Sequence, residues 1–258
     1  MLSPRPSHLS PALVRVASPL LFGLAWELAA RRLDSLLIPG CLETLRELTR
    51  LASTRELWQA LWLSNQAMIL GFALAVVVGV PLGLWMGRSR TAERFLNPYL
   101  SILIAIPKSA LIPVVIMATG LGLLSRVLVT FSFSLVSITV NTRAGLRLIE
   151  PAWLEMARSF GASEGQIWRK ILVRGSLPAL LTGLRLGAAR AITGMITVEL
   201  LLVAVGIGRL MLDFEGTFNS AGLYATVLVI VAEAVLMLQA FRWLERRIVP
   251  WATREANR

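Results

Sequence analysis

Cysteine and histidine are almost absent from this 258-residue sequence, which contains one of each, Cys41 and His8. A single cysteine cannot form an intramolecular disulfide, and these two residues cannot supply the ligands of a structural zinc site. Because His8 lies in the N-terminal tail, no Ser-His or Cys-His dyad can form inside an apolar segment. We therefore expect no metal site, no cofactor and no catalytic residue of a membrane-embedded protease or transferase.

Charged residues are also scarce, at 16% of the chain, whereas hydrophobic residues make up 56%. This composition is more apolar than a soluble core requires. The apolar residues fall into blocks, several of which reach the length of about 20 residues that a helix needs to cross a hydrocarbon layer. The sequence therefore predicts an all-α integral membrane protein with six transmembrane helices. The predicted helices are 12–30, 64–87, 99–120, 125–142, 177–205 and 222–239.

One transmembrane domain accounts for the chain between two short tails. The tails are 1–11 and 251–258, and the domain is 12–250. Arg5 before the first apolar segment would also suit a signal peptide, but Trp26 and Glu27 stand where small residues should mark the cleavage site. We interpret this segment as an uncleaved helix.

Smaller patterns predict how particular helices are used. Leucines recur every three residues from Leu42 to Leu48 among charged residues, which indicates an amphipathic helix at the membrane edge. Glycines in the second apolar segment, such as Gly71 and Gly79, let neighbouring membrane helices approach closely. The third apolar segment contains Pro107 and Pro113, which remove backbone donors and predict a helix that lines a cavity or a neighbour.

Lysine and arginine are distributed unevenly between the two ends of the predicted helices. More than half of the 26 basic residues fall before the first predicted helix, after the last one, and in the loops after the second and fourth segments. Six crossings place both termini on one side, and the positive-inside rule assigns that side to the cytoplasm. This asymmetry and anionic lipid also explain the net charge of +11, so a nucleic-acid partner is not required.

The polar stretch 150–178 interrupts the apolar blocks and predicts two short helices joined by a turn. The first would run over Pro151–Phe160, with proline at its first position and Gly161 as a left-handed cap. The second would begin at a capping box on Ser163 and run to about Arg174. The stretch therefore predicts a helix, a glycine elbow and a second helix.

Apolar residues form a stripe along the first of these short helices. The stripe consists of Trp153, Met156, Ala157 and Phe160, at spacings of three and four residues. Such a stripe fills a hydrophobic groove on a partner or packs on the protein's own helices, and periodicity leaves both interpretations open.

The same stretch resembles the EAA loop of ABC-transporter permeases, which has the pattern Glu-Ala-Ala, then Gly, then an apolar-Leu-Pro ending. The matching positions are Glu155, Ala157, Gly161, Leu177 and Pro178, and Met156 replaces the first alanine. Further segments are similar to the nitrate/sulfonate/taurine branch of binding-protein-dependent permeases. They are 37–39, 71–87, 106–113, Asn141-Thr142 with Gly145, 183–200 and 206–210. The resemblance covers about 36–250, and its ordered series of motifs is more specific than one motif alone.

The resemblance implies a type I, MetI-like importer permease in a bacterial inner membrane. It implies a homodimer of six-helix subunits, each with a cytoplasmic ATPase subunit at the EAA loop and a periplasmic solute-binding protein on the opposite side. The residues it assigns to ATPase coupling are Glu155, Met156, Ala157, Phe160, Gly161 and Pro178. The chain itself has no phosphate-binding Gly-x-x-x-x-Gly-Lys-Ser/Thr motif, so ATP hydrolysis is expected on another chain.

Charges inside the predicted spans are further candidate site residues, because each costs about 3 kcal/mol or more in mid-bilayer unless it faces a cavity or partner. They are Lys108, Arg185, Arg190, Glu199 and Glu233. One hypothesis is that Lys108 and Arg190 favour an anionic solute in the pathway. The other is that these cations pair with Glu199 and Glu233 to hold the helices together.

The solute class follows only from the resemblance, which implies a nitrate-, sulfonate-, taurine- or thiamine-precursor-like molecule. The stretch 117–122 lacks the tryptophan and phenylalanine that many relatives carry there, so a particular solute cannot be transferred. An ion-coupled secondary carrier that uses Glu199 or Glu233 is the alternative function, although such a carrier would not require the EAA loop.

Overall fold

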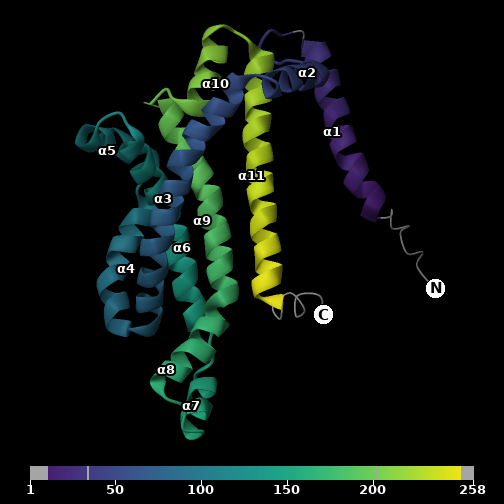
Figure 1. Ribbon diagram of the computed structural model, residues 1–258. Coiled ribbons are helices and arrows are strands. Elements are labelled where there is room, and N and C mark those ends of the chain that lie inside the picture. The colour runs from purple at the N-terminus through teal and green to yellow at the C-terminus, as the bar shows by residue number, and fades with distance from the viewer. Residues whose placement is uncertain (1–10, 34, 202, 251–258) are drawn as a thin grey trace, which may run out of the picture. The chain divides into compact units, whose positions relative to one another are not determined.

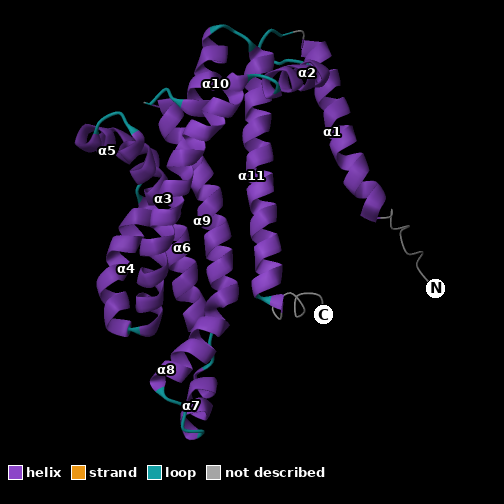
Figure 2. Cartoon of the chain, in the orientation of Figure 1, coloured by secondary structure: helices purple, strands orange, loops and turns teal. Residues whose placement is uncertain are grey.

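The computed structural model of the chain describes residues 11–33, 35–201 and 203–250, and only the backbone of 11–16 (Figure 1). Apart from Pro11, the predicted tails 1–11 and 251–258 lie outside the described residues. Every regular element in these ranges is helical (Figure 2), which confirms the predicted all-α class.

The helices differ widely in length. The longer ones are α1 (Pro11–Leu33), α3 (Arg55–Arg88), α4 (Arg90–Ala105), α6 (Leu123–Arg147), α9 (Val173–Leu201) and α11 (Ser220–Ile248). The shorter ones are α2 (Cys41–Ala52), the 3-10 turn η1 (Lys108–Leu111), α5 (Ile112–Thr119), α7 (Pro151–Ser159), α8 (Glu164–Ile167), the π-helical η2 (Trp168–Leu172) and α10 (Gly206–Gly216).

Four helical stretches among the described residues are long and apolar enough to cross a membrane, and one bent helix pair could be a fifth. The four stretches are Arg55–Arg88, Leu123–Arg147, Glu164–Leu201 and Ser220–Ile248. Six spans are therefore not confirmed. The first predicted span, 12–30, falls in α1, which is not among the four.

The predicted third span, 99–120, is wrong as a single straight helix. It is broken between α4 and the η1–α5 segment, and the two parts are bent by 95°. Ile106 is extended, with ψ 128°, because the residue before a proline avoids the helical region. Pro107 is extended as well, with ψ 108°, and lacks the N–H that would continue the helix.

The predicted ends of the helices around the polar stretch also need correction. The second short helix does not stop near Arg174, because α8, η2 and α9 form one helical stretch, Glu164–Leu201. Pro178 lies inside α9 and does not end it, as is tolerated where neighbouring helices cover the freed carbonyl. Helix α9 ends at Leu201 rather than near Val205. The next helix, α10, was not predicted from the sequence.

Glycines bring α3, α6 and α9 into close contact, and the three helices lie side by side in Figure 1. A Cβ added at Gly83 of α3 would lie 2.6 Å from the Cβ of Thr142 on α6. A Cβ added at Gly187 of α9 would lie 2.6 Å from the Cγ1 of Ile138, also on α6. Helix α6 therefore packs between two glycine-bearing faces, which confirms the close approach predicted from the glycines.

The chain divides into two compact units, 1–58 with 210–229 and 59–209 with 230–258. In the first unit, the predicted amphipathic helix is α2, and it is joined to α1 by a hydrogen bond from the Leu42 N–H to the Glu27 carboxylate at 3.2 Å. The candidate site residues described next all lie in the second unit.

Candidate functional site

Helix α7 is a well-capped short helix at the ends of α6 and α9. Pro151 occupies its first turn, and Gly161 follows it with a left-handed φ of 75°. The Gly161 N–H donates to the Arg158 carbonyl at 2.9 Å, and the Ala162 N–H donates to the Ala157 carbonyl at 3.0 Å. These two bonds form a Schellman motif, so the predicted first helix and its glycine cap are confirmed.

The apolar stripe on α7 is divided between two faces. Ala157 is buried in a cluster with Leu146, Ile167 and Leu172, and Leu154 packs against the same cluster. The other three stripe residues project outward: Trp153 is 59%, Met156 56% and Phe160 85% exposed. Ala157 therefore packs on the protein's own helices, whereas the other three stripe residues each expose more than half of their surface in the described part of the chain.

Glu164 ties α7 to the end of α3. Its carboxylate accepts from Arg158 of α7 and from Arg88 of α3, each at 3.0 Å. The Arg88 guanidinium also lies 5.9 Å from the centroid of the Trp168 ring. The Ser163 side chain and Gln166 form the predicted capping box at the start of α8. The turn between α7 and α8 is thus fixed by the ion pairs of Glu164 and by the capping box at Ser163.

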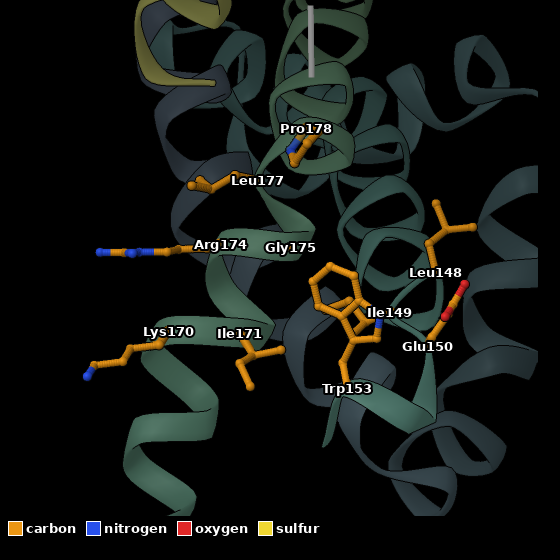
Figure 3. Close-up of a pocket in the computed structure, with 10 residues that line it drawn as sticks. All are labelled: Leu148, Ile149, Glu150, Trp153, Lys170, Ile171, Arg174, Gly175, Leu177 and Pro178. Atoms are coloured by element: carbon orange, nitrogen blue, oxygen red, sulfur yellow. The ribbon is translucent and has the colours of Figure 1, made fainter. Parts of the chain in front are cut away.

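A pocket of about 950 Å³ opens beside α7, between the end of α6 and the first turns of α9 (Figure 3). Figure 3 shows Trp153 and Ile149 together on one side and the side chains of Lys170 and Arg174 extending away from them. Pro178, the last residue of the EAA pattern, also lines this pocket. Glu155, the first residue of the pattern, is exposed and forms no ion pair among the described residues.

Glu199, one of the predicted intramembrane charges, is fully buried and paired with a residue that the sequence reading missed. Its carboxylate accepts from Ser64 Oγ at 2.8 Å, from the Gly208 N–H at 3.1 Å and from Arg126 Nη1 at 3.3 Å. Ser64 Oγ in turn accepts from the Ile207 N–H at 2.9 Å. Arg126 is a basic residue near the start of apolar α6, which marks it as a candidate in the sequence without identifying Glu199 as its partner.

Lys108 and Arg190 line one pocket of about 370 Å³ at the break between α4 and η1. The Lys108 Nζ lies 5.9 Å from the centroid of the Phe133 ring. Neither cation forms an ion pair within the part of the chain that the structure describes. The predicted pairing of these cations with Glu199 and Glu233 is not seen among the described residues, where Glu199 is paired with Arg126 instead.

The last two predicted charges lie apart from that pocket. Arg185 pairs with Glu245 of α11 at 3.0 Å. The two oxygens of Glu233 are buried and make no hydrogen bond to any described residue. Among the described residues, no three histidine, cysteine, aspartate or glutamate side chains gather in a way that could hold a metal ion.

Comparison with known proteins adds three findings. The profile of the family described as "Binding-protein-dependent transport system inner membrane component" matches residues 79–250. The taurine transport system permease protein TauC of Escherichia coli (strain K12) is 28% identical over 233 residues, which cover 88% of this chain and 84% of TauC. The formylaminopyrimidine transport permease protein ThiX of Halalkalibacterium halodurans is 28% identical over 242 residues, which cover 92% of this chain and 94% of ThiX.

Among solved structures, an inward-facing MetNI methionine ABC transporter chain has a TM-score of 0.61. It is 21% identical, and the match covers 76% of this chain and 95% of that chain. This likeness shows a MetI-like helical fold.

Proposed function

The chain belongs to the family of binding-protein-dependent transport system inner membrane components, and from this premise we propose that α7 is the docking helix for a separate ATPase subunit. Membership makes the chain a multi-pass membrane subunit of a binding-protein-dependent ABC importer. Such membrane subunits are not catalytic, so hydrolysis takes place on the ATPase.

The observation that carries the proposal is the exposed apolar face of α7. Trp153, Met156 and Phe160 recur at helical spacing, and each exposes more than half of its surface. Large apolar side chains that project together from a short helix are the pattern of a helix that lies in a partner's groove. Glu155 lies on the same helix, exposed and without an ion pair in the described chain, and offers a charge for a basic residue of the partner.

The attachment of α7 supports a role in transmitting movement. Ala157 and Leu154 anchor it to Leu146 at the end of α6. Glu164 joins it to Arg88 at the end of α3. When closing ATPase subunits move the groove, α7 therefore carries the ends of these membrane helices with it as one rigid body. The change of the pathway between inward and outward access is then a population shift between two packed states.

The rest of the assembly follows from the family. Two copies of the chain form the pathway in a bacterial inner membrane, both termini and the 150–178 loop are cytoplasmic, and a periplasmic binding protein delivers the solute on the opposite side. The solute is a small molecule with a sulfonate or similar anionic group, because one relative is named for taurine, a zwitterion that carries a sulfonate group. The second relative is named for formylaminopyrimidine, so a thiamine-precursor-like molecule is the second candidate class of solute.

Two substitutions in the loop test the docking proposal. Glu155→Arg reverses the exposed charge, and Gly161→Pro imposes a φ near −65° where the chain has 75°. We expect either variant to insert into the membrane normally and to lose co-purification of the ATPase. Glu43→Arg, a charge reversal on exposed α2, is the matched control and should retain it. Recovery of the ATPase at normal yield with both loop variants would contradict the proposal.

The energy source separates this function from that of a secondary carrier. Uptake by the complete transporter in vesicles should require ATP inside the cytoplasmic compartment and persist in the presence of an uncoupler. Uptake that continues without ATP and collapses with an uncoupler would instead assign transport to an ion gradient.

A further inference from the structure

We propose that Lys108 and Arg190 form a binding site for the anionic head of the transported solute, within the pathway of the importer proposed above, on which this inference rests. The two cations come from segments that are distant in sequence, the broken α4–η1 connection and the middle of α9. Nothing in the family match assigns them a role. The site would take a small oxyanion, such as a sulfonate.

The pocket is built from three segments of the second unit. It is lined by Ile106, Lys108, Ser109, Phe133, Arg190 and Thr197. Its volume of about 370 Å³ falls at the lower end of the range for small-ligand sites, which is roughly 300–1,000 Å³. Irregular backbone at membrane depth is tolerated where it lines a water-filled cavity or is buried in protein, and this pocket lies at such a break. The irregular backbone between α4 and η1 therefore lines this pocket.

Lys108, which is partly buried, and Arg190, which is exposed, have no ion-pair partner among the described residues. No acidic residue lines the pocket. Glu199 is already bound to Arg126, and Glu245 is bound to Arg185. Two cations that share a pocket also repel each other, which adds to the cost of about 3 kcal/mol for each charge in mid-bilayer. An anion between Lys108 and Arg190 would remove both penalties.

The side chains suit an oxyanion in particular. The Arg190 guanidinium can donate two parallel hydrogen bonds to adjacent oxygens of one group, while Lys108 acts as a point charge. Phe133 lies beneath the ammonium and holds it through a cation–π contact without neutralising it. The Thr197 hydroxyl already donates to the Thr193 carbonyl at 2.6 Å, so Ser109 is the hydroxyl donor of the site.

The depth of Arg190 favours a solute over a lipid headgroup as the source of the anion. At a rise of about 1.5 Å per residue, Arg190 lies roughly 25 Å from Val173 and roughly 16 Å from Leu201 along α9. Lipid phosphates lie at the membrane surface rather than near the middle of a spanning helix. A solute that passes through the membrane must reach this depth.

The test uses the complete transporter, with its ATPase and binding protein, in vesicles and with taurine as the sulfonate probe. We expect Lys108→Gln and Arg190→Gln each to lower the rate of ATP-driven taurine uptake at limiting taurine by at least tenfold, because each loses a charged hydrogen bond. Lys108→Arg keeps the charge and should stay within about threefold of the wild type. Arg242→Gln, at an exposed position outside the pocket, should leave uptake unchanged.

Three further readouts decide the source of the anion and the cause of a loss. Co-purification of the ATPase and ATP hydrolysis stimulated by the binding protein should remain normal in both glutamine variants. Normal taurine uptake in the two glutamine variants overturns the proposed anion site. It does so even if the variants bind less anionic lipid or form fewer dimers, because the cations would then serve lipid or subunit contacts instead of the solute. If the wild type takes up taurine equally in vesicles with and without anionic lipid, the solute is supported as the source of the bound anion. Uptake that depends on anionic lipid overturns that assignment.

Two controls keep this inference separate from the proposed function. If the wild type shows no ATP-driven uptake of any solute, the proposed function fails. If it takes up only a neutral pyrimidine and excludes taurine, methanesulfonate and nitrate, the anion site alone fails. Should the glutamine variants not assemble, Ser109→Ala removes one donor without changing the charge. It should raise the KM for taurine about threefold or more, and an unchanged KM would contradict the site.

Discussion

Glu199 and Arg126 show how one buried pair can hold several segments in place. The Glu199 carboxylate on α9 binds Ser64 of α3, Arg126 of α6 and the backbone of Gly208 at the start of α10. Arg126 also donates to the Leu63 carbonyl at 3.1 Å. A charge without a partner is costly in such a place, whereas a pair that is fully hydrogen-bonded is tolerated. The pair therefore has a structural explanation that requires no solute.

We predict that Arg126→Gln destabilises the protein more than the double variant Arg126→Gln/Glu199→Gln. The single change leaves a buried carboxylate without its cation, a defect that costs about 3–5 kcal/mol in buried pairs. The double change removes both charges and keeps hydrogen-bonding amides. The thermal unfolding midpoint in detergent, with Arg185→Gln as the control for a half-exposed pair, measures the difference. A double variant no more stable than Arg126→Gln would show that the pair is not the source of the stability.

At this scale the sequence predicted part of the arrangement. Arg190 and Glu199 were both predicted as intramembrane charges of one helix, and the structure places them in different environments. The partner of Glu199 could not be predicted, because Arg126 lies 73 residues away and hydropathy does not tell which helices are neighbours. The shared pocket of Lys108 and Arg190 likewise depends on the bend after Ala105.

Helix packing in the second unit depends on glycine at particular positions, and Gly83 of α3 provides a test. An added Cβ would lie 2.6 Å from the Cβ of Thr142 and 2.7 Å from the backbone oxygen of Thr139. We expect Gly83→Ala to lower stability, because overpacking costs typically about 1–3 kcal/mol and exceeds the gain of up to about 1 kcal/mol in helix propensity. Thermal unfolding and the yield of assembled transporter measure the effect.

The matched control for Gly83→Ala is Gly165→Ala in α8. Apart from its chain neighbours and the local helix backbone, no atom lies within 4 Å of a Cβ added there, so the change is expected to be neutral or to stabilise the protein by about 0.4–1 kcal/mol. Equal destabilisation by both substitutions would attribute the effect to glycine in general rather than to contact with α6.

For individual helices, the sequence predicted the caps correctly but not where several of the helices end. Proline at the start of α7, the glycine cap and the capping box at Ser163 are each set by neighbouring residues, so the sequence predicted them. The π-helical η2 links α8 to α9 without a break, and no local residue announces it. The two faces of α7 could be separated only once Ala157 was placed in its cluster.

For the whole molecule, the distribution of basic residues predicts which side of the membrane each loop faces. The argument depends on α9 crossing once between the α7 loop and the turn after α10, and the stretch that contains α9 is long and apolar enough to do so. Because arginine and lysine near helix ends favour the cytoplasmic side, the α7 loop should face the cytoplasm and the turn after Gly216 the periplasm. The two sides of a single crossing can be examined independently.

We predict that a membrane-impermeant maleimide labels Gly216→Cys in intact spheroplasts and labels Ser159→Cys only after permeabilisation. Both substitutions are made in a Cys41→Ser background, because Cys41 is the natural cysteine of the chain. Ser159 and Gly216 are both exposed, so labelling reports the side of the membrane rather than burial. The reverse pattern would invert the orientation and remove the ATPase from α7. Labelling of both positions from one side would mean that α9 does not cross, and the anion site would then lie outside any pathway through the membrane.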